Sequence, residues 1–215
     1  MDRYQVAAVV PAFNEAETIS NVVMSLLPLL HVIVVNDNSS DKTAQLALAA
    51  GATVVSNHIN LGYDSSLEAG FKAAHEMGMS KVITFDADGQ HPVSEVPLFI
   101  DKLTEYDVVV GRRQNTARWA EALFAHVAKW MWGIDDPLCG MKGYKVTAYL
   151  KNSGFDSCNS IGTELAIQSQ RRGLKLFNIP LLVEEREFGK PRFGQYFKAN
   201  VIILKALIRV LCKRV

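Results

Sequence analysis

The sequence has few cysteines, and their spacing gives them no structural role. Among its 215 residues only Cys139, Cys158 and Cys212 are cysteines, and no Cys-x-x-Cys pair occurs. An odd number of widely spaced cysteines argues against both a disulfide framework and a zinc site. We therefore expect a protein of a reducing compartment.

Long hydrophobic runs are also absent, although 49% of the residues are hydrophobic. No apolar run reaches the roughly 18 residues that indicate a transmembrane helix. The N-terminal segment has an acid at Asp2 and a short apolar run before Pro11, which does not fit a signal peptide. These absences predict a cytoplasmic protein without a membrane-spanning helix.

Glycine-rich phosphate loops are missing as well. The chain contains neither G-x-x-x-x-G-K-[ST] nor a G-x-G-x-x-G after its first apolar segment, so a nucleotide bound here is not held by glycine amides. A nucleic-acid-binding function would depend on the basic C-terminal residues alone, without an aromatic platform that stacks on bases. We expect no nucleic-acid partner.

Apolar segments alternate with helical ones through the first half of the chain. We expect strands at residues 5–10, 31–36, 52–56, 81–85 and 107–111. The helices between them are expected from about Asn14, in a segment closed by Gly51, and at residues 63–78 and 92–106. Continuous apolar strands separated by helices predict an α/β fold with a mostly parallel sheet that has helices on both faces.

The second half is less regular. It predicts helices at residues 118–133 and 163–173, a strand near 139–146, and one or two strands within 174–187. The last segment, residues 196–215, predicts a basic amphipathic helix. No domain linker is evident.

Polar and acidic residues follow the expected strands where each strand ends. Asp86 and Asp88 come directly after the strand "KVITF", and such a pair of carboxylates suits Mg²⁺ or Mn²⁺, which prefer oxygen ligands. In open parallel sheets, ligands bind at the carboxyl ends of the strands. The alternative is a pair of loop aspartates that cap the next helix; the position after a buried strand favours the metal.

Seven segments occur together in a familiar order: "VVPAFNEAETI", "VIVVNDNSSDKTA", "NLGYDSSLEAGFKAA", "ITFDADGQHP", "DVVVGRR", "DPLCGMKGYKV" and "EREFGKPRFG". From about Val6 to Gly194 the chain resembles the family 2 glycosyltransferases of the Rossmann-like GT-A fold. Within that family it is most similar to dolichyl-phosphate mannose synthases and bacterial polyprenyl-phosphate sugar transferases. Any one segment is weak evidence, but seven in register are specific.

The resemblance implies a set of site residues and a divalent cofactor, Mg²⁺ or Mn²⁺. The nucleotide of a UDP- or GDP-linked sugar would contact Pro11, Ala12, Phe13, Glu15, Asp37 and Asp86. The metal would be held by Asp86, Asp88 and Gln90. The catalytic group would comprise Arg113, Asp136 and Lys142, to which we add Glu164 as a second candidate base. The phosphate of the acceptor would meet Arg186, Lys190 and Arg192.

The sequence departs from the family pattern in places that concern the sugar and the acceptor more than the fold. Residues 36–38, "NDN", replace the usual "DDG", so one acid is missing. Tyr63 and Asp64 stand where the family prefers a basic residue and a glycine. Cys139 and Pro191 each replace a serine.

We expect a metal-dependent, inverting glycosyltransferase that moves a sugar from a nucleotide diphosphate to a polyprenyl phosphate. A phosphate acceptor is mostly ionised at neutral pH and needs little help from a base. One alternative is a glycosyltransferase acting on a saccharide hydroxyl in cell-surface polysaccharide assembly, which needs a base such as Asp136 or Glu164. Another is a non-catalytic nucleotide-binding partner of a membrane complex.

The C-terminal residues are strongly basic: from Arg186 to the end the chain has eight Lys or Arg and one acid. We divide the chain into a catalytic domain, residues 1–195, and an amphipathic helix, residues 196–215, that contacts a membrane surface. The protein would then be peripheral on the cytoplasmic face of the membrane. Trp119, Trp130 and Trp132 offer a second interfacial contact, although we favour core packing for them.

Overall fold

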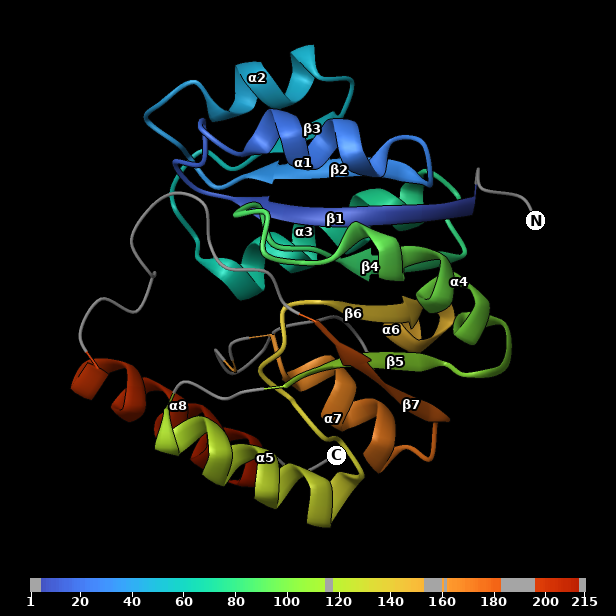
Figure 1. Cartoon of the computed structure of the whole chain (residues 1–215), viewed down its shortest axis with the longest axis vertical. Coiled ribbons are helices and arrows are strands. Elements are labelled where there is room, and N and C mark those ends of the chain that lie inside the picture. Colours follow the sequence, from blue (N-terminus) through green and yellow to red (C-terminus); the bar gives the residue numbers. More distant parts are fainter. Residues whose placement is uncertain (1–4, 115–117, 153–159, 161, 183–195, 213–215) are drawn as a thin grey trace.

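A single seven-stranded sheet with helices on both faces forms the molecule (Figure 1). The computed structural model describes residues 5–114, 118–152, 160, 162–182 and 196–212. The strands are β1 (Val6–Ala12), β2 (His31–Asn36), β3 (Thr53–Ser56), β4 (Lys81–Thr84), β5 (Val108–Arg113), β6 (Lys142–Lys145) and β7 (Leu176–Leu181). The predicted α/β class is confirmed.

The α-helices and one 3₁₀ turn connect these strands. They are α1 (Ile19–Leu26), α2 (Thr43–Ala49), α3 (Tyr63–Glu76), η2 (Val93–Glu95), α4 (Val96–Glu105), α5 (Trp119–Trp132), α6 (Val146–Lys151), α7 (Glu164–Arg171) and α8 (Tyr196–Cys212). Helix α5 ends at Gly133, whose φ of 68° is a left-handed conformation that glycine adopts without strain. None of the helices in the described ranges is long and apolar enough to cross a membrane.

The strand order is β3-β2-β1-β4-β6-β5-β7. The strands run parallel except β6, which is antiparallel to its neighbours β4 and β5. In this register Lys142, at the start of β6, lies opposite Thr84, at the end of β4. The reversed strand therefore brings its first residue to the edge where the parallel strands end.

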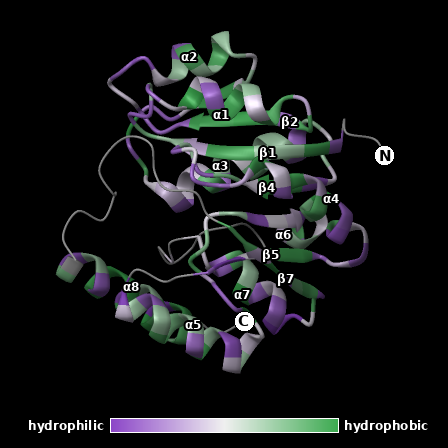
Figure 2. Ribbon diagram, viewed as in Figure 1, coloured by the Kyte–Doolittle hydropathy of each residue, from purple (hydrophilic) through white to green (hydrophobic). Residues whose placement is uncertain are grey.

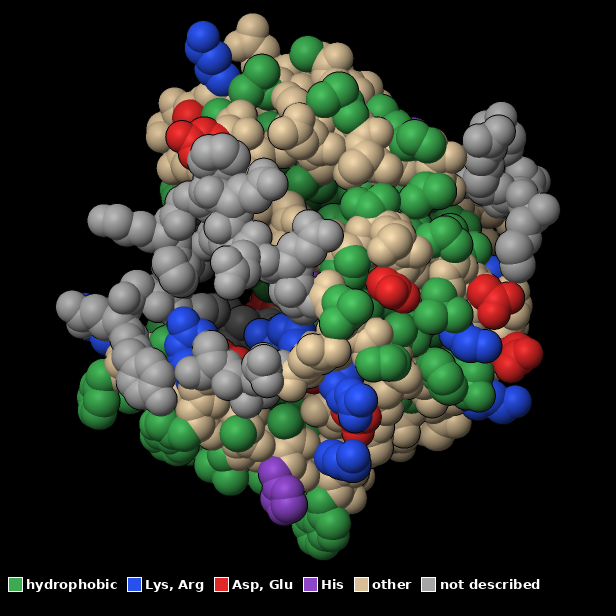
Figure 3. Space-filling view, in the orientation of Figure 1, with side chains coloured by type: hydrophobic (Ala, Val, Ile, Leu, Met, Phe, Trp, Pro, Cys, Tyr) green, Lys and Arg blue, Asp and Glu red, His purple; other side chains and the backbone are tan. Residues whose placement is uncertain are grey.

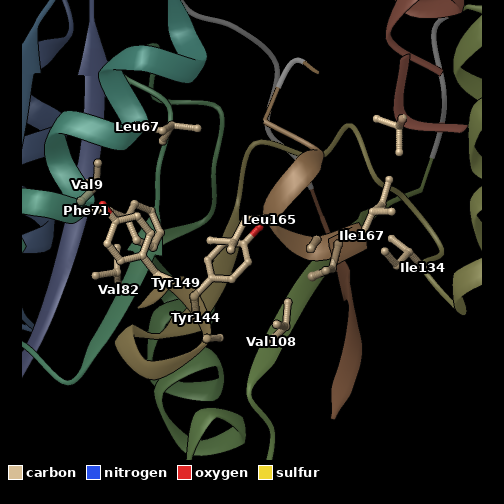
Figure 4. Packing of buried hydrophobic residues seen from close by; sticks show 14 of the residues in the cluster. Val9, Leu67, Phe71, Val82, Val108, Ile134, Tyr144, Tyr149, Leu165 and Ile167 are labelled. Atoms are coloured by element: carbon tan, nitrogen blue, oxygen red, sulfur yellow. The ribbon is translucent and has the colours of Figure 1, made fainter. Parts of the chain in front are cut away.

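Two apolar layers hold the helices on the sheet, because alternate strand residues point to opposite faces. Val10 packs with α1, α2 and α4 on one face, whereas Val9 packs with α3 and the later helices on the other. Figure 4 shows part of the second layer, where Phe71 of α3 meets Tyr144 of β6 and Tyr149 of α6. In Figure 2 the strands are largely hydrophobic, as expected for a sheet buried on both faces.

Three expectations from the sequence need correction. The first helix begins at Ile19 rather than near Asn14, because Asn14 has a φ of 54° and the amides of Glu15 and Ala16 bond to side chains of another loop. Residues 146–151 form a short helix, α6, that was not predicted. The described part of residues 174–187 contains one strand, β7.

Helix α8 packs along α5 at one side of the molecule (Figure 1). Its buried residues, among them Ile203 and Leu207, belong to the same core layer as α3 and the sheet. The Asn200 side chain accepts a hydrogen bond of 3.2 Å from the backbone amide of Ala120, the second residue of α5. The helix predicted for the C-terminal segment is present and has one face buried in the core.

Candidate active site

Most of the predicted site residues that the structure describes lie where the parallel strands end. Ala12 of β1 is paired with Asn36 of β2, so Phe13 and Asp37 leave the sheet side by side. Strand β4 ends at Thr84, two residues before Asp86, and faces Lys142 of β6. Lys142 is in turn paired with Val110 of β5, the strand that ends at Arg113. The topology thus brings together residues that are up to about 130 positions apart in the sequence, as the carboxyl-end rule predicts.

The carboxylate of Asp86 is held on three sides. Its Oδ1 accepts a hydrogen bond of 3.1 Å from the Tyr63 hydroxyl, and its Oδ2 lies 2.9 Å from Nε2 of His91. A methyl group at Gly140 would come within 2.7 Å of Oδ1 and closer still to Oδ2. The carboxylate is therefore fixed between two polar side chains and the bare Cα of a glycine.

Asp88 and Gln90 occupy the turn that follows. Oδ1 of Asp88 accepts a bond of 3.1 Å from the Gln90 amide, and Gly89 between them has a φ of 78°. The carbonyl of Ala87 accepts a bond of 2.7 Å from the buried Thr18 hydroxyl, which fastens this turn to the start of α1. The turn that presents Asp88 is thus anchored to a second element.

The oxygens of Asp86 and Asp88 are suited to an open Mg²⁺ site, in which the substrate supplies further ligands, rather than to a site built from protein ligands alone. Among the described residues no three His, Cys, Asp or Glu side chains gather as a metal site. Mg²⁺ usually takes one or two carboxylates and completes its shell with water and substrate phosphates. Asp86 and Asp88, one residue apart after β4, supply oxygen ligands of that kind.

Asp37 is 4% exposed and already binds three donors. One oxygen accepts from the Asn57 side chain at 2.8 Å and from the Leu61 amide at 2.9 Å, and the other accepts from the Gly62 amide at 2.8 Å. Asp37 therefore fixes the loop that leads into α3, whatever further contact it makes with a base.

The loop after β1 contains the other residues predicted to contact the nucleotide. Pro11 and Ala12 are buried at the end of the strand, whereas Phe13 is 42% exposed. The backbone amide of Glu15 donates a bond of 2.8 Å to the Thr43 hydroxyl at the start of α2. An exposed ring beside a fixed backbone is suited to stacking on a planar ligand.

A buried ion network connects the end of β5 to α5. Arg113 donates through Nε and Nη2 to the two oxygens of Asp136, at 2.7 and 3.0 Å, and its Nη2 lies 3.4 Å from Glu121. Glu121 also accepts a bond of 2.8 Å from Arg118. Burial alone would lower the pKa of Arg113, but the bonds to Asp136 outweigh it and raise that pKa, so the guanidinium stays charged.

Lys142 is a buried lysine in the same region. Its Nζ donates a bond of 2.5 Å to the carbonyl of Cys139. Burial lowers the pKa of Lys142, while the charges of Asp136 and Asp86 act in the opposite direction. Burial also raises the pKa of the Cys139 thiol to about 12, so this cysteine stays protonated and is no nucleophile.

Glu164 is the first residue of α7 and is 7% exposed. Its amide bonds to the Ser160 hydroxyl at 3.0 Å, and the Gly162 amide donates to the Asp64 carboxylate. The start of α3 therefore holds the loop before Glu164. The predicted acceptor residues Arg186, Lys190 and Arg192 lie outside the described residues.

Analysis of the sequence missed the partners of the site acids. His91 had no assigned role, and Tyr63 was noted only as a departure from the family pattern. Their contacts with Asp86 depend on the loop that Asp37 holds and on the turn after Asp88, neither of which a periodicity analysis describes. Only the family resemblance pointed to Gly140, which lies in the segment "DPLCGMKGYKV". No local sequence pattern explains why position 140 must be glycine.

Comparison with known proteins agrees with the fold and identifies the family. A family model described as "Glycosyl transferase family 2" matches residues 7–136, more than half of the chain. The chain therefore belongs to glycosyl transferase family 2, and it is a glycosyltransferase of the GT-A fold. This membership sets aside the non-catalytic alternative.

Curated relatives match along most of their length. The chain is 25% identical to the undecaprenyl-phosphate mannosyltransferase of Micrococcus luteus, over 88% of each chain. It is 26% identical to the dolichyl-phosphate hexose transferase of Haloferax volcanii, over 95% of this chain and 92% of the relative.

A solved structure with the same fold is the glucosyl-3-phosphoglycerate synthase of Mycobacterium tuberculosis in complex with Mn²⁺ and UDP-glucose. The TM-score is 0.77 at 22% identity, over 98% of this chain and 80% of that one.

Proposed function

We propose that this glycosyltransferase moves a sugar from a UDP- or GDP-linked donor to a polyprenyl phosphate, with inversion at the anomeric carbon. The undecaprenyl- and dolichyl-phosphate relatives support the acceptor, and the mycobacterial complex with Mn²⁺ and UDP-glucose supports the donor and the cofactor. The observation that carries the proposal is the fixed Asp86 and the nearby Asp88, directly after β4 and next to the buried Lys142.

In the proposed reaction an oxygen of the acceptor phosphate forms a bond to the anomeric carbon. The bond from that carbon to the donor diphosphate breaks, and the nucleoside diphosphate leaves with the electron pair. A bound divalent cation would act as a Lewis acid on the leaving phosphates. Asp86 and Asp88 would hold it with Gln90 beside them, and Lys142 would stabilise the same negative charge.

The contacts of Asp136 argue against this residue as the base that a sugar hydroxyl would need. A hydroxyl nucleophile needs a base within hydrogen-bond reach, whereas a phosphate monoester, with a second pKa of about 6, is mostly ionised at pH 7. Asp136 is 3% exposed and both of its oxygens are bound by Arg113. We therefore assign Asp136 to holding Arg113 rather than to accepting a proton.

We also propose that α5 and α8 form a membrane-docking face, and that the protein acts peripherally on the cytoplasmic face of the membrane. Trp132 is 7% exposed and packs in the core, as expected, whereas Trp119 is 53% exposed and Trp130 is 83% exposed. Phe197 of α8 is 79% exposed. Figure 3 shows hydrophobic side chains along this lower side of the molecule. In this division residues 1–195 perform the transfer, and residues 196–215 contact the lipid together with α5.

Calorimetry with UDP and with GDP, each with and without Mn²⁺, tests the donor site. We expect one of the two nucleotides to bind in a metal-dependent manner, and we expect Asp88→Asn to abolish the metal-dependent part of the binding. Asp101→Asn is the matched control, because its carboxylate is 60% exposed on α4 and pairs only with Lys102 among the contacts described for it. A wild-type protein that is folded but binds neither nucleotide would contradict the proposal.

Turnover with short polyprenyl phosphates then tests the acceptor. The donor in this assay is a nucleotide sugar with the base that binds in calorimetry. We expect the wild-type enzyme to transfer the sugar to the polyprenyl phosphate and not to free sugars. Transfer to a saccharide hydroxyl instead would show that the enzyme belongs to polysaccharide assembly.

A further inference from the structure

Tyr63 connects three parts of the site. It is the first residue of α3 and follows Gly62, whose amide is bound by Asp37. Its hydroxyl donates to Oδ1 of Asp86 at 3.1 Å. Its ring lies against Gly162, where a Cβ would come within 2.9 Å of the Tyr63 Cε1 atom. The side chain thus spans the space between the end of β4 and the loop before Glu164.

His91 binds the other oxygen of the same carboxylate. The residue is 6% exposed, its Nε2 is 2.9 Å from Oδ2 of Asp86, and its ring packs edge-on against Phe85 with centroids 5.3 Å apart. This contact assigns the ring proton to Nε2. Among the described residues Nδ1 has no hydrogen-bond partner. A buried polar atom without a partner lowers stability, so packing alone does not account for a histidine at this position.

Gly140 closes the third side. Nothing but a hydrogen fits between its Cα and the carboxylate, since a Cβ would fall within 2.6 Å of Cγ of Asp86. The backbone of this glycine is fixed in turn, because its carbonyl accepts a bond of 2.5 Å from the Thr84 hydroxyl. Three independent elements, α3, the turn after β4 and the segment before β6, therefore determine one carboxylate orientation.

We propose that Tyr63 and His91 are positioning residues that fix Asp86 for the cation of a bound nucleoside diphosphate. Because each partner binds a different oxygen, the two contacts together fix the plane and the direction of the carboxylate. Groups that hydrogen-bond a metal ligand orient it and increase the affinity of the site. The inference rests on the proposed function, because it takes Asp86 as part of the donor site.

Tyr63→Phe is the first test, because it removes the hydroxyl and keeps the ring against Gly162. We expect Mn²⁺-dependent binding of UDP or GDP, whichever the wild-type protein binds, to weaken by about tenfold, with metal-free binding unchanged. Tyr149→Phe is the matched control. It removes a tyrosine hydroxyl that also donates to a carboxylate, Glu68 at 2.6 Å, on the core side of the same helix.

His91→Gln and His91→Asn form the second test. The glutamine amide nitrogen is as many bonds from Cα as Nε2 of histidine, so it can still donate to Asp86, whereas the asparagine nitrogen stops short. We expect His91→Asn to weaken Mn²⁺-dependent nucleotide binding by about tenfold and His91→Gln to retain most of it. A change in packing alone would affect the two variants alike.

The outcomes separate this inference from the function on which it rests. Weaker metal-dependent binding in Tyr63→Phe and His91→Asn, with Tyr149→Phe and His91→Gln near wild type, would support it. Unchanged binding in Tyr63→Phe and His91→Asn, in a wild-type background that binds, would overturn the positioning role alone. A wild-type protein that binds neither nucleotide would overturn the proposed function and this inference with it.

Discussion

Asp136 and Arg113 illustrate how burial decides what a side chain can do. Their two-point contact places a full negative charge, 3% exposed, against a guanidinium that also reaches Glu121. Such a pair adds little to stability as a whole, but removing one member leaves the other charge buried and uncompensated. The prediction that follows concerns stability more than the rate of transfer.

Asp136→Asn should lower the free energy of unfolding by about 3 kcal/mol, because Arg113 loses its main counter-charge. Denaturant unfolding measures this loss. The neighbouring Asp135→Asn is the control and should cost less than about 1 kcal/mol, since Asp135 pairs with the more exposed Arg112 and Lys129. Equal losses in the two variants would show that burial does not govern the pair.

The same variant also tests whether Asp136 acts in the chemical step. For a phosphate acceptor, the rate constant of folded Asp136→Asn should stay within about tenfold of wild type, because no proton has to be removed. A loss of roughly a hundredfold or more, in protein shown to be folded, would contradict this expectation and give Asp136, or the Arg113 that it holds, a part in the chemical step.

At the scale of elements, the apolar runs were enough to predict the strands of the sheet, but they did not predict the conformations of the loops. Segments such as "VIVVN" are buried on both faces, so both their strand character and their parallel pairing could be inferred. Strand β6 runs antiparallel because α5 and the segment after it bring the chain back to the same edge of the sheet at which β5 ends, which no local pattern specifies. The contacts of Tyr63, His91 and Gly140 with Asp86 were missed for a related reason, because these residues meet only in the folded chain.

Side chains of the loop after β2 hold the loop after β1. Oδ2 of Asp41 accepts a bond of 3.1 Å from the Ala16 amide, and its Oδ1 accepts bonds from the amide and the hydroxyl of Thr43, at 2.9 and 2.5 Å. The Thr43 hydroxyl in turn accepts from the Glu15 amide. These bonds satisfy the backbone amides of Glu15 and Ala16 outside a helix, which fits the start of α1 at Ile19.

The same bonds predict a pH dependence. Burial is the largest single influence on Asp41 and opposes its ionisation, but the bonds from Thr43 and Ala16 together outweigh it and lower the pKa of this carboxyl below its ordinary value of 3.8. Its contribution to stability is therefore fully present above about pH 3.8 and is lost as the pH falls through the lower, folded-state pKa. We expect less than about 1 kcal/mol, because the carboxylate is exposed to solvent.

Thermal unfolding of wild type and Asp41→Asn across the acid range checks this dependence. The wild type should unfold at the higher temperature at neutral pH, and the difference should shrink as the pH falls below about 3.8. A difference that stays constant down to pH 2 would show that the ionised form of Asp41 is not what fastens the two loops.

At the scale of the whole molecule, the surface of α5 and α8 differs from the rest. Helix α8 contains three cations and no acid, and its exposed side combines Lys198, Lys205 and Arg209 with Phe197 and Ile208. Helix α5 adds the exposed Trp119 and Trp130. Interfacial aromatic side chains and basic residues favour an anionic bilayer surface.

The location of this face matches the proposed acceptor. Glu121, in the first turn of α5, bonds to Arg113 at the end of β5, so the docking face and the site share a rigid connection. A lipid phosphate lies at the level of the headgroups, so an enzyme that rested its α5–α8 side on the bilayer would lie beside its proposed acceptor. We therefore expect membrane binding through α5 and α8 and the use of a lipid phosphate acceptor to occur together.

Flotation with vesicles that contain anionic lipid tests it in the full-length chain. The double variant Trp130→Ser/Phe197→Ser should lose most of its bound fraction, and Lys205→Glu should weaken binding by more than about fivefold, since each basic residue near such a surface contributes about 1 kcal/mol. Added salt should reduce the effect of Lys205→Glu, because it screens exposed charges. Neither change alters a core residue, so the fold should persist.

Leu48→Ser provides the matched control, because Leu48 is 65% exposed on α2, at the opposite end of the molecule (Figure 1). It removes an exposed apolar side chain without touching α5 or α8, and its bound fraction should equal that of wild type. If Leu48→Ser reduced binding as much as the double variant, the association would be non-specific. If the wild type did not float at all, α5 and α8 would have to be covered by something other than a bilayer.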